Sequence, residues 1–178
     1  MNDDLILRAA RLAAIAHNGQ KRKWAHFDDS YVSHPMRVAG LVALSSRATP
    51  EMVAAAWVHD VLEDTKLIAQ DISDACGDKV LELVWELTNA SFDSTMKDKP
   101  RAERKAADRR KIAGASWEAR FIKLADRIDN LRDMNESKAP ADFAELYKKE
   151  SKFLLEVLRG TDTVLEKQLE NLIGCVAG

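Results

Sequence analysis

Apolar residues recur at intervals of three and four along most of this chain, the spacing that places them on one face of an α-helix. The clearest case is 117–134, where Phe121, Leu124, Ile128 and Leu131 form an apolar stripe. Segments 5–16 and 80–87 show the same spacing. Runs of alternating β-branched residues, which would predict strands, are absent from the sequence. The pattern therefore predicts an all-α fold.

Proline and capping residues mark where several helices begin. Thr49 precedes Pro50, a pair that suits the cap and the first turn of a helix, and Ser33 stands before Pro35 in a similar way. The further helices that we expect cover 33–44, 50–64, 101–113, 139–158 and 161–172. The whole chain, 1–178, is predicted to form a single domain of roughly eight to ten helices.

The composition limits the class of protein and its partners. A chain of 178 residues suits one domain, and its 46% of hydrophobic residues excludes a disordered protein. A net charge of −2 gives no general attraction for nucleic acid, and the apolar runs are too short to span a membrane. Neither partner is therefore expected, and no obligate protein partner is evident.

The cysteines and the start of the chain predict a cytoplasmic protein. Cys76 and Cys175 are too few for a disulfide framework and have no metal-ligand spacing. The first four residues are acidic or neutral, whereas a secretory signal would begin with basic residues.

Segment 97–111 differs from the rest of the chain because it contains eight basic residues and three acidic ones. Most charge runs of this kind are solvated helix faces. The alternative is a face that binds phosphate groups. The charge pattern alone leaves both interpretations open.

The segment AAWVHDVLEDT combines an apolar run with four ionisable residues, His59, Asp60, Glu63 and Asp64. On one continuous helix, His59 would share a face with Glu63, and Asp60 would share one with Asp64. Carboxylates that are buried need a metal, a charged partner or protons. Imidazole and carboxylate ligands together suit a divalent ion such as Mn²⁺, Fe²⁺ or Zn²⁺.

Two further residues could complete such a site. His34 lies at the start of a predicted helix, and Asp126 lies inside the apolar segment FIKLADRI. Taken alone, His34 would be interpreted as a capping or core histidine, and Asp126 as an ion-pair partner of Lys123 or Arg127. Taken together with His59 and Asp60, they form the series His, His-Asp, Asp, which favours a metal site.

This series resembles the ligand pattern of the HD phosphohydrolase superfamily. Three segments in order, HNGQKRKWAHFDDSYVSHPMRVAGLV, AAWVHDVLEDT and FIKLADRIDNLRDM, resemble the hydrolase domain of the RelA/SpoT family. The resemblance extends over about 5–172. It is closest to the stand-alone small alarmone hydrolases of the Mesh type, which share the segments AERK and LRGT.

The resemblance implies an all-α HD fold and an enzyme. The implied reaction is the metal-dependent removal of the 3′-pyrophosphate from (p)ppGpp, with GDP or GTP and pyrophosphate as products. Mn²⁺ is the implied cofactor, and Fe²⁺ and Zn²⁺ also suit the ligands. The small-molecule nucleotide is the implied partner.

The resemblance also assigns roles to individual residues. The implied metal ligands are His34, His59, Asp60 and Asp126. Glu63 and Asp64 match the catalytic acid pair, and the sequence does not decide which of them is the general base. The implied substrate contacts are Arg22 and Lys23 at the base, Asn130 along the nucleoside, Tyr147 in the same pocket, and Arg104 at phosphate.

Two departures from the family pattern concern the nucleoside pocket. The loop 24–30 contains no glycine, and Asp133 stands where the long family members often have threonine. These departures leave the base specificity open, so a preference for (p)ppApp is one alternative. Two others are an NADPH 2′-phosphatase or nucleotidase of the same superfamily and a non-enzymatic module that binds alarmones. The presence of both Glu63 and Asp64 argues against the last of these.

Overall fold

The computed structural model describes residues 3–23, 29–136 and 139–174, which form ten α-helices, two short 3-10 helices and no strand. The α-helices are α1 (Asp3–Ala16), α2 (Ser33–Ala43), α3 (Pro50–Val58), α4 (Val61–Asp64), α5 (Ala69–Cys76), α6 (Asp78–Leu87), α7 (Arg101–Ala113), α8 (Trp117–Glu136), α9 (Ala141–Leu158) and α10 (Thr163–Gly174). The predicted all-α fold of eight to ten helices is confirmed. Within the described residues, no helix combines the length and apolarity needed to cross a membrane.

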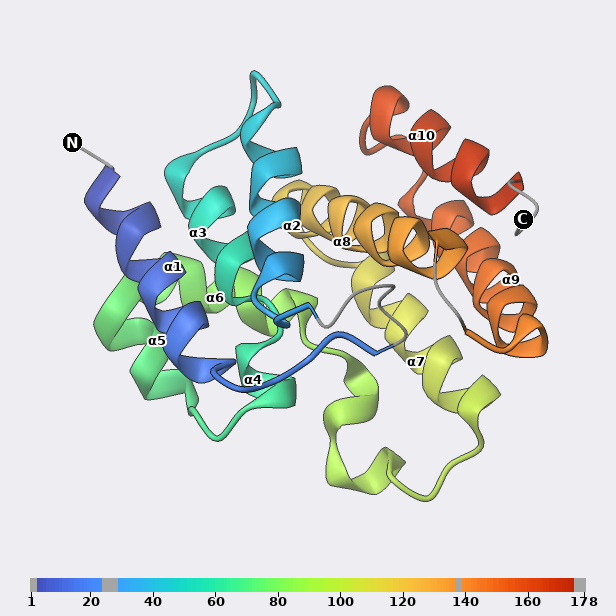
Figure 1. Ribbon diagram of the computed structural model, residues 1–178, viewed down its shortest axis with the longest axis horizontal. Coiled ribbons are helices and arrows are strands. Elements are labelled where there is room, and N and C mark those ends of the chain that lie inside the picture. The colour runs from blue at the N-terminus through green and yellow to red at the C-terminus, as the bar shows by residue number, and fades with distance from the viewer. Residues whose placement is uncertain (1–2, 24–28, 137–138, 175–178) are drawn as a thin grey trace.

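Helix α8 lies at the centre of the molecule (Figure 1). Helices α2, α3 and α6 pack against it on one side, and α9 and α10 pack against it on the other. Its predicted apolar stripe is confirmed, because Phe121, Leu124, Ile128 and Leu131 are all buried. The opposite face of α8 is also covered, but it holds polar residues, and Asp126 and Asp129 there are buried.

The predicted helix starts are confirmed at one position and wrong at another. Thr49 caps α3, since its Oγ1 accepts a hydrogen bond from the backbone N–H of Met52 at 3.2 Å, and Pro50 follows as expected. Ser33 does not cap α2. The helix already includes Ser33, and Val32 occupies the capping position without a side-chain hydrogen bond.

The predicted continuous helix over 50–64 is wrong, because α3 ends at Val58 and α4 begins at Val61. The His59 ring explains the break: its Nδ1 lies 2.8 Å from the carbonyl oxygen of Ala56. In a continuing helix that oxygen would accept from the N–H of Asp60. His59 and Asp60 stand at this break, where Asp60 approaches His34 of α2 and His59 approaches Asp126 of α8.

Candidate metal centre and nucleotide pocket

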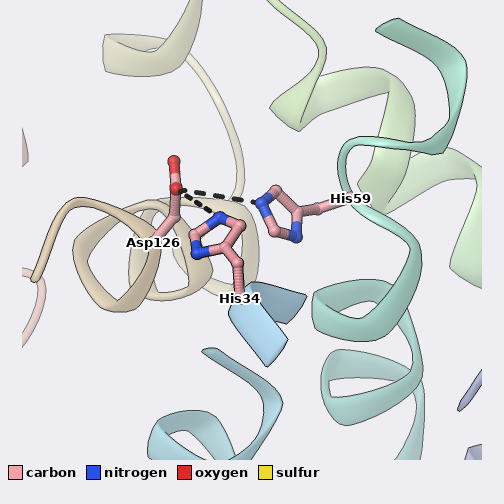
Figure 2. Close-up of side chains that lie close together, drawn as sticks. All are labelled: His34, His59 and Asp126. Atoms are coloured by element: carbon pink, nitrogen blue, oxygen red, sulfur yellow. Dashed lines mark ion pairs between the residues drawn. The ribbon is translucent and has the colours of Figure 1, made fainter. Parts of the chain in front are cut away.

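Three predicted ligands lie together although they come from distant parts of the chain. His34 is on α2, His59 follows α3, and Asp126 is on α8, and their ligand atoms all lie within 4.8 Å of one another. Figure 2 shows both imidazole rings turned towards the Asp126 carboxylate. Its Oδ1 is 3.3 Å from Nε2 of His34 and 3.8 Å from Nε2 of His59. All three residues are buried.

The outward nitrogen of each ring has a partner, so the inward nitrogen is available as a ligand. Nδ1 of His34 lies 2.7 Å from Oδ2 of Asp129, and Nδ1 of His59 lies 2.8 Å from the Ala56 carbonyl. A carbonyl or carboxylate oxygen only accepts, so each neutral ring carries its proton on Nδ1. The buried Nε2 of His59 has no partner among the described residues that meets the geometry of a hydrogen bond. This donor set fits a divalent metal ion.

Asp60, the fourth predicted ligand, lies at the edge of this cluster. Its Oδ2 is 3.1 Å from Nε2 of His59 and 3.5 Å from Nε2 of His34. The same oxygen accepts a hydrogen bond from the hydroxyl of Tyr31 at 2.6 Å. The carboxylate is therefore turned towards the two inward ring nitrogens.

The carboxylates of this cluster favour positive charge beside them. Burial by itself would lower the pKa of His59, but the Asp60 and Asp126 carboxylates outweigh burial and raise that pKa well above its usual value. Burial would raise the pKa of Asp126, whereas Lys123, 2.9 Å from Oδ2 of Asp126, and the two histidines hold it well below its usual range. A metal ion would therefore compete with protons for this site.

The two predicted catalytic acids, both on α4, have different surroundings. Both oxygens of Glu63 accept from Asn89, from its backbone N–H at 2.7 Å and from its side-chain amide at 2.8 Å. Asp64 accepts at 2.9 Å from the Tyr31 hydroxyl that also contacts Asp60. Burial raises the pKa of both acids, and the nearby Asp60 raises that of Asp64 further. Asp64 thus lies next to the metal cluster, because it shares the Tyr31 hydroxyl with Asp60. Glu63 is instead held by Asn89.

A cavity of about 550 Å³ adjoins the metal cluster. Four of the five predicted substrate contacts line it, and they are Arg22, Lys23, Asn130 and Tyr147. Asp64 and Tyr31 line the same cavity, so it reaches the acid nearest the metal cluster. The structure also adds Phe143 to the wall, a residue that the sequence did not suggest.

Arg22 is held in a fixed position within this cavity. Its Nη2 donates to Oδ1 of Asn130 at 2.9 Å, and its Nε donates to Oδ2 of Asp133 at 2.9 Å. The guanidinium also lies over the Tyr31 ring, 5.5 Å from the centroid. Asp133, one of the two departures from the family pattern, therefore has a structural role, because its carboxylate orients Arg22. The other departure, in the loop 24–30, lies mostly outside the described residues.

Arg104 is not among the residues that line this cavity. It lies in α7, and its buried Nε has no hydrogen-bond partner in the described part of the chain. Sequence reasoning also missed the residues that surround the ligands, chiefly Asp129, Tyr31 and Arg37. Asp129 follows Asp126 by three positions on α8, so helical spacing could have indicated that the two acids share a face.

Comparison with known proteins agrees with this geometry. Residues 9–152 match the HD domain family. The chain is 33% identical over 173 residues to the guanosine-3′,5′-bis(diphosphate) 3′-pyrophosphohydrolase MESH1 of Xenopus tropicalis, covering 94% of this chain and 92% of the relative. It is also 33% identical to human MESH1 over 172 residues, with the same coverage.

A solved structure shows the same likeness in three dimensions. It is that of a metazoan ortholog of SpoT described as hydrolysing ppGpp, and it matches this chain with a TM-score of 0.84 at 30% identity. The match covers 94% of this chain and 93% of the other. This chain therefore belongs to the HD domain family and, within it, to the RelA/SpoT-type small alarmone hydrolases that the MESH1 proteins represent.

Proposed function

We propose that this chain hydrolyses the 3′-pyrophosphate of ppGpp and pppGpp to give GDP or GTP and pyrophosphate. The main supporting observation is that one face of α8 supplies Asp126 to the metal cluster and Asn130 to the adjoining cavity. A nucleotide in the cavity would then have its ribose next to the metal cluster. The curated relatives named above are 3′-pyrophosphohydrolases of this type, and the solved relative hydrolyses ppGpp.

The HD domain implies dependence on a divalent metal. His34, His59 and Asp126 would hold the ion, and Asp60 would complete the set. We propose Mn²⁺ as the ion, and Fe²⁺ and Zn²⁺ also suit two imidazoles and two carboxylates. When bound, such an ion acidifies a water molecule and neutralises charge on a phosphate group.

We assign the general base to Asp64. Its Oδ2 is occupied by the Tyr31 hydroxyl, so Oδ1 would take the proton from the attacking water. The water oxygen would bond to the phosphorus attached to the ribose O3′, and the O3′–P bond would break. O3′ would take a proton from solvent, and the newly formed pyrophosphate would dissociate. Glu63, held by Asn89 through both of its oxygens, would orient the water and is the second candidate for the base.

The substrate roles remain those that the resemblance implies. Arg22 and Lys23 would contact the base, Asn130 and Tyr147 the nucleoside. Arg104 would meet phosphate groups from α7, and its buried, unpaired Nε is a donor without a partner among the described residues. We also propose that 1–178 acts as one domain, since α10 packs against α8 and α9. The cytoplasmic location stays a prediction.

A substrate panel tests the proposal. The metal-free protein is loaded with Mn²⁺ and offered ppGpp, ppApp and NADPH at equal concentrations. We expect release of pyrophosphate from ppGpp with GDP as the second product. If ppGpp stays intact while NADPH loses phosphate, the chain is a phosphatase of the same superfamily. If ppApp alone is cleaved, the assignment of guanine is wrong.

The metal-free protein should show raised pKa values for Asp64 and Glu63. Burial raises both pKa values, and the nearby Asp60 carboxylate adds to the rise at Asp64. A bound cation would oppose the rise, because a nearby positive charge favours the ionised carboxylate. The measurement is an NMR titration of the two carboxyl groups without metal and with saturating Zn²⁺. We expect midpoints above the ordinary carboxylate pKa of about 4 without metal, and lower midpoints with Zn²⁺. Midpoints at or below about 4 in the metal-free protein would contradict the prediction.

A further inference from the structure

Polar side chains form a continuous stripe along the face of α8 that meets α2. They stand at positions i, i+3, i+4 and i+7, and they are Asp126, Asp129, Asn130 and Asp133. Helix α2 contributes His34 and Arg37, one turn apart, to the same contact. The stripe therefore begins at the metal cluster and ends at the nucleotide cavity.

Asp129 connects the metal cluster to Arg37. Its side chain is fully buried, and its Oδ2 accepts from Nδ1 of His34 at 2.7 Å. Arg37 donates to the same carboxylate twice, from Nε to Oδ1 at 2.6 Å and from Nη2 to Oδ2 at 3.1 Å. This fork holds the carboxylate in one orientation, and the carboxylate in turn holds the His34 ring.

The same guanidinium extends to the nucleotide cavity. Nη2 of Arg37 lies 3.0 Å from each oxygen of Asp133, the residue that accepts from Nε of Arg22. Asp133 is 25% exposed and Arg37 is 33% exposed, so this half of the connection borders solvent. Arg37 thus bridges two carboxylates four positions apart on α8, each of which holds a different part of the site.

We propose that Arg37 is a positioning residue for both halves of the site: through Asp129 it orients His34, and through Asp133 it orients Arg22. This inference rests on the proposed function only in taking a guanine nucleotide as the ligand of the cavity. Arg37 is not one of the three clustered ligand residues and does not itself line the cavity, although it contacts Asp133, which does. Its effect on both must therefore pass through the two aspartates.

For substitutions of Arg37 and Asp133, the loss of charge and the loss of orientation predict opposite effects on ligand affinity. Removing the positive charge of Arg37 would by itself strengthen the binding of a cation nearby, whereas loss of the His34 orientation weakens it. Removing the negative charge of Asp133 would by itself strengthen the binding of an anionic nucleotide, whereas loss of the Arg22 orientation weakens it. The sign of the change in Mn²⁺ affinity for Arg37, and in nucleotide affinity for Asp133, therefore distinguishes a positioning role from a simple effect of charge.

The experiment measures two affinities separately. Mn²⁺ binding to the nucleotide-free protein is followed by electron paramagnetic resonance, and GDP binding to the metal-free protein by calorimetry. Arg37→Met should weaken Mn²⁺ about tenfold, the lower end of the loss seen when partners of metal ligands are removed, and should also weaken GDP. Asp133→Asn should weaken GDP several-fold and leave Mn²⁺ binding near the original value.

Arg159→Met is the matched control. Arg159 also bridges two carboxylates four positions apart on one helix, Glu166 and Glu170 of α10, and it should leave both affinities unchanged. Mn²⁺ binding by Arg37→Met that equals or exceeds that of the original protein overturns the proposal, as does undiminished GDP binding by Asp133→Asn. Both affinities can be measured without following ppGpp hydrolysis. A chain that binds both ligands but leaves ppGpp intact would overturn only the proposed function.

Discussion

Replacement of His59 by alanine is expected to lower ppGpp hydrolysis by about three orders of magnitude. Nε2 of His59 is buried, has no hydrogen-bond partner among the described residues and faces His34 and Asp126, so we propose that it binds the metal ion. A bound ion contributes several kcal/mol to the stabilisation of the reacting phosphate, and each 1.4 kcal/mol is a factor of about ten in rate. Pyrophosphate release and Mn²⁺ affinity should both be measured.

The control for this variant is His17, a buried histidine outside the cluster. Nδ1 of His17 lies 2.8 Å from the side chain of Gln20, and its ring packs against Tyr31, so His17→Ala should keep its Mn²⁺ affinity. Chelation of the original protein should reproduce the His59→Ala loss, and added Mn²⁺ should restore activity only to the original protein. Turnover by a folded His59→Ala protein at the original rate would rule out the proposed metal centre.

The fold could be predicted where burial imposes a helical period. Helix α8 was predicted because its apolar stripe repeats with the helix, and the structure buries that stripe. Helix α5 was missed because Ile72 and Cys76 are the two residues that it buries, too few to produce a pattern. The break between α3 and α4 was missed because it depends on the His59 ring contacting a carbonyl, which residue spacing does not show.

The site could be predicted to the extent that unusual residues stand in apolar surroundings. His34, His59 and Asp126 were notable in the sequence for this reason, and the structure brings them together. Arg37 and Asp129 were not notable, because charges on a helix are ordinarily solvated. Their importance depends on how α2 packs against α8, which is a long-range contact that the local sequence does not encode.

Asp64→Asn should lower kcat for ppGpp by about 10²- to 10⁴-fold, the range that general base catalysis contributes. Asparagine has the same shape, and its carbonyl oxygen can still accept from the Tyr31 hydroxyl, so the change removes chiefly the ability to take a proton. Mn²⁺ affinity and KM should stay close to the original values. Single-turnover rates at saturating Mn²⁺ give the loss in the chemical step.

The comparison with Glu63→Gln makes this prediction decisive for the choice of base. Both oxygens of Glu63 accept from Asn89, so glutamine must turn its amide group against one of those two donors. Part of its effect should therefore appear as lower stability, visible in the melting temperature. Asp64→Asn should instead melt like the control Asp74→Asn, a change at an exposed position of α5. If Glu63→Gln loses more kcat than Asp64→Asn while both retain Mn²⁺, the general base is Glu63, and the carboxylate that Tyr31 contacts instead orients the water.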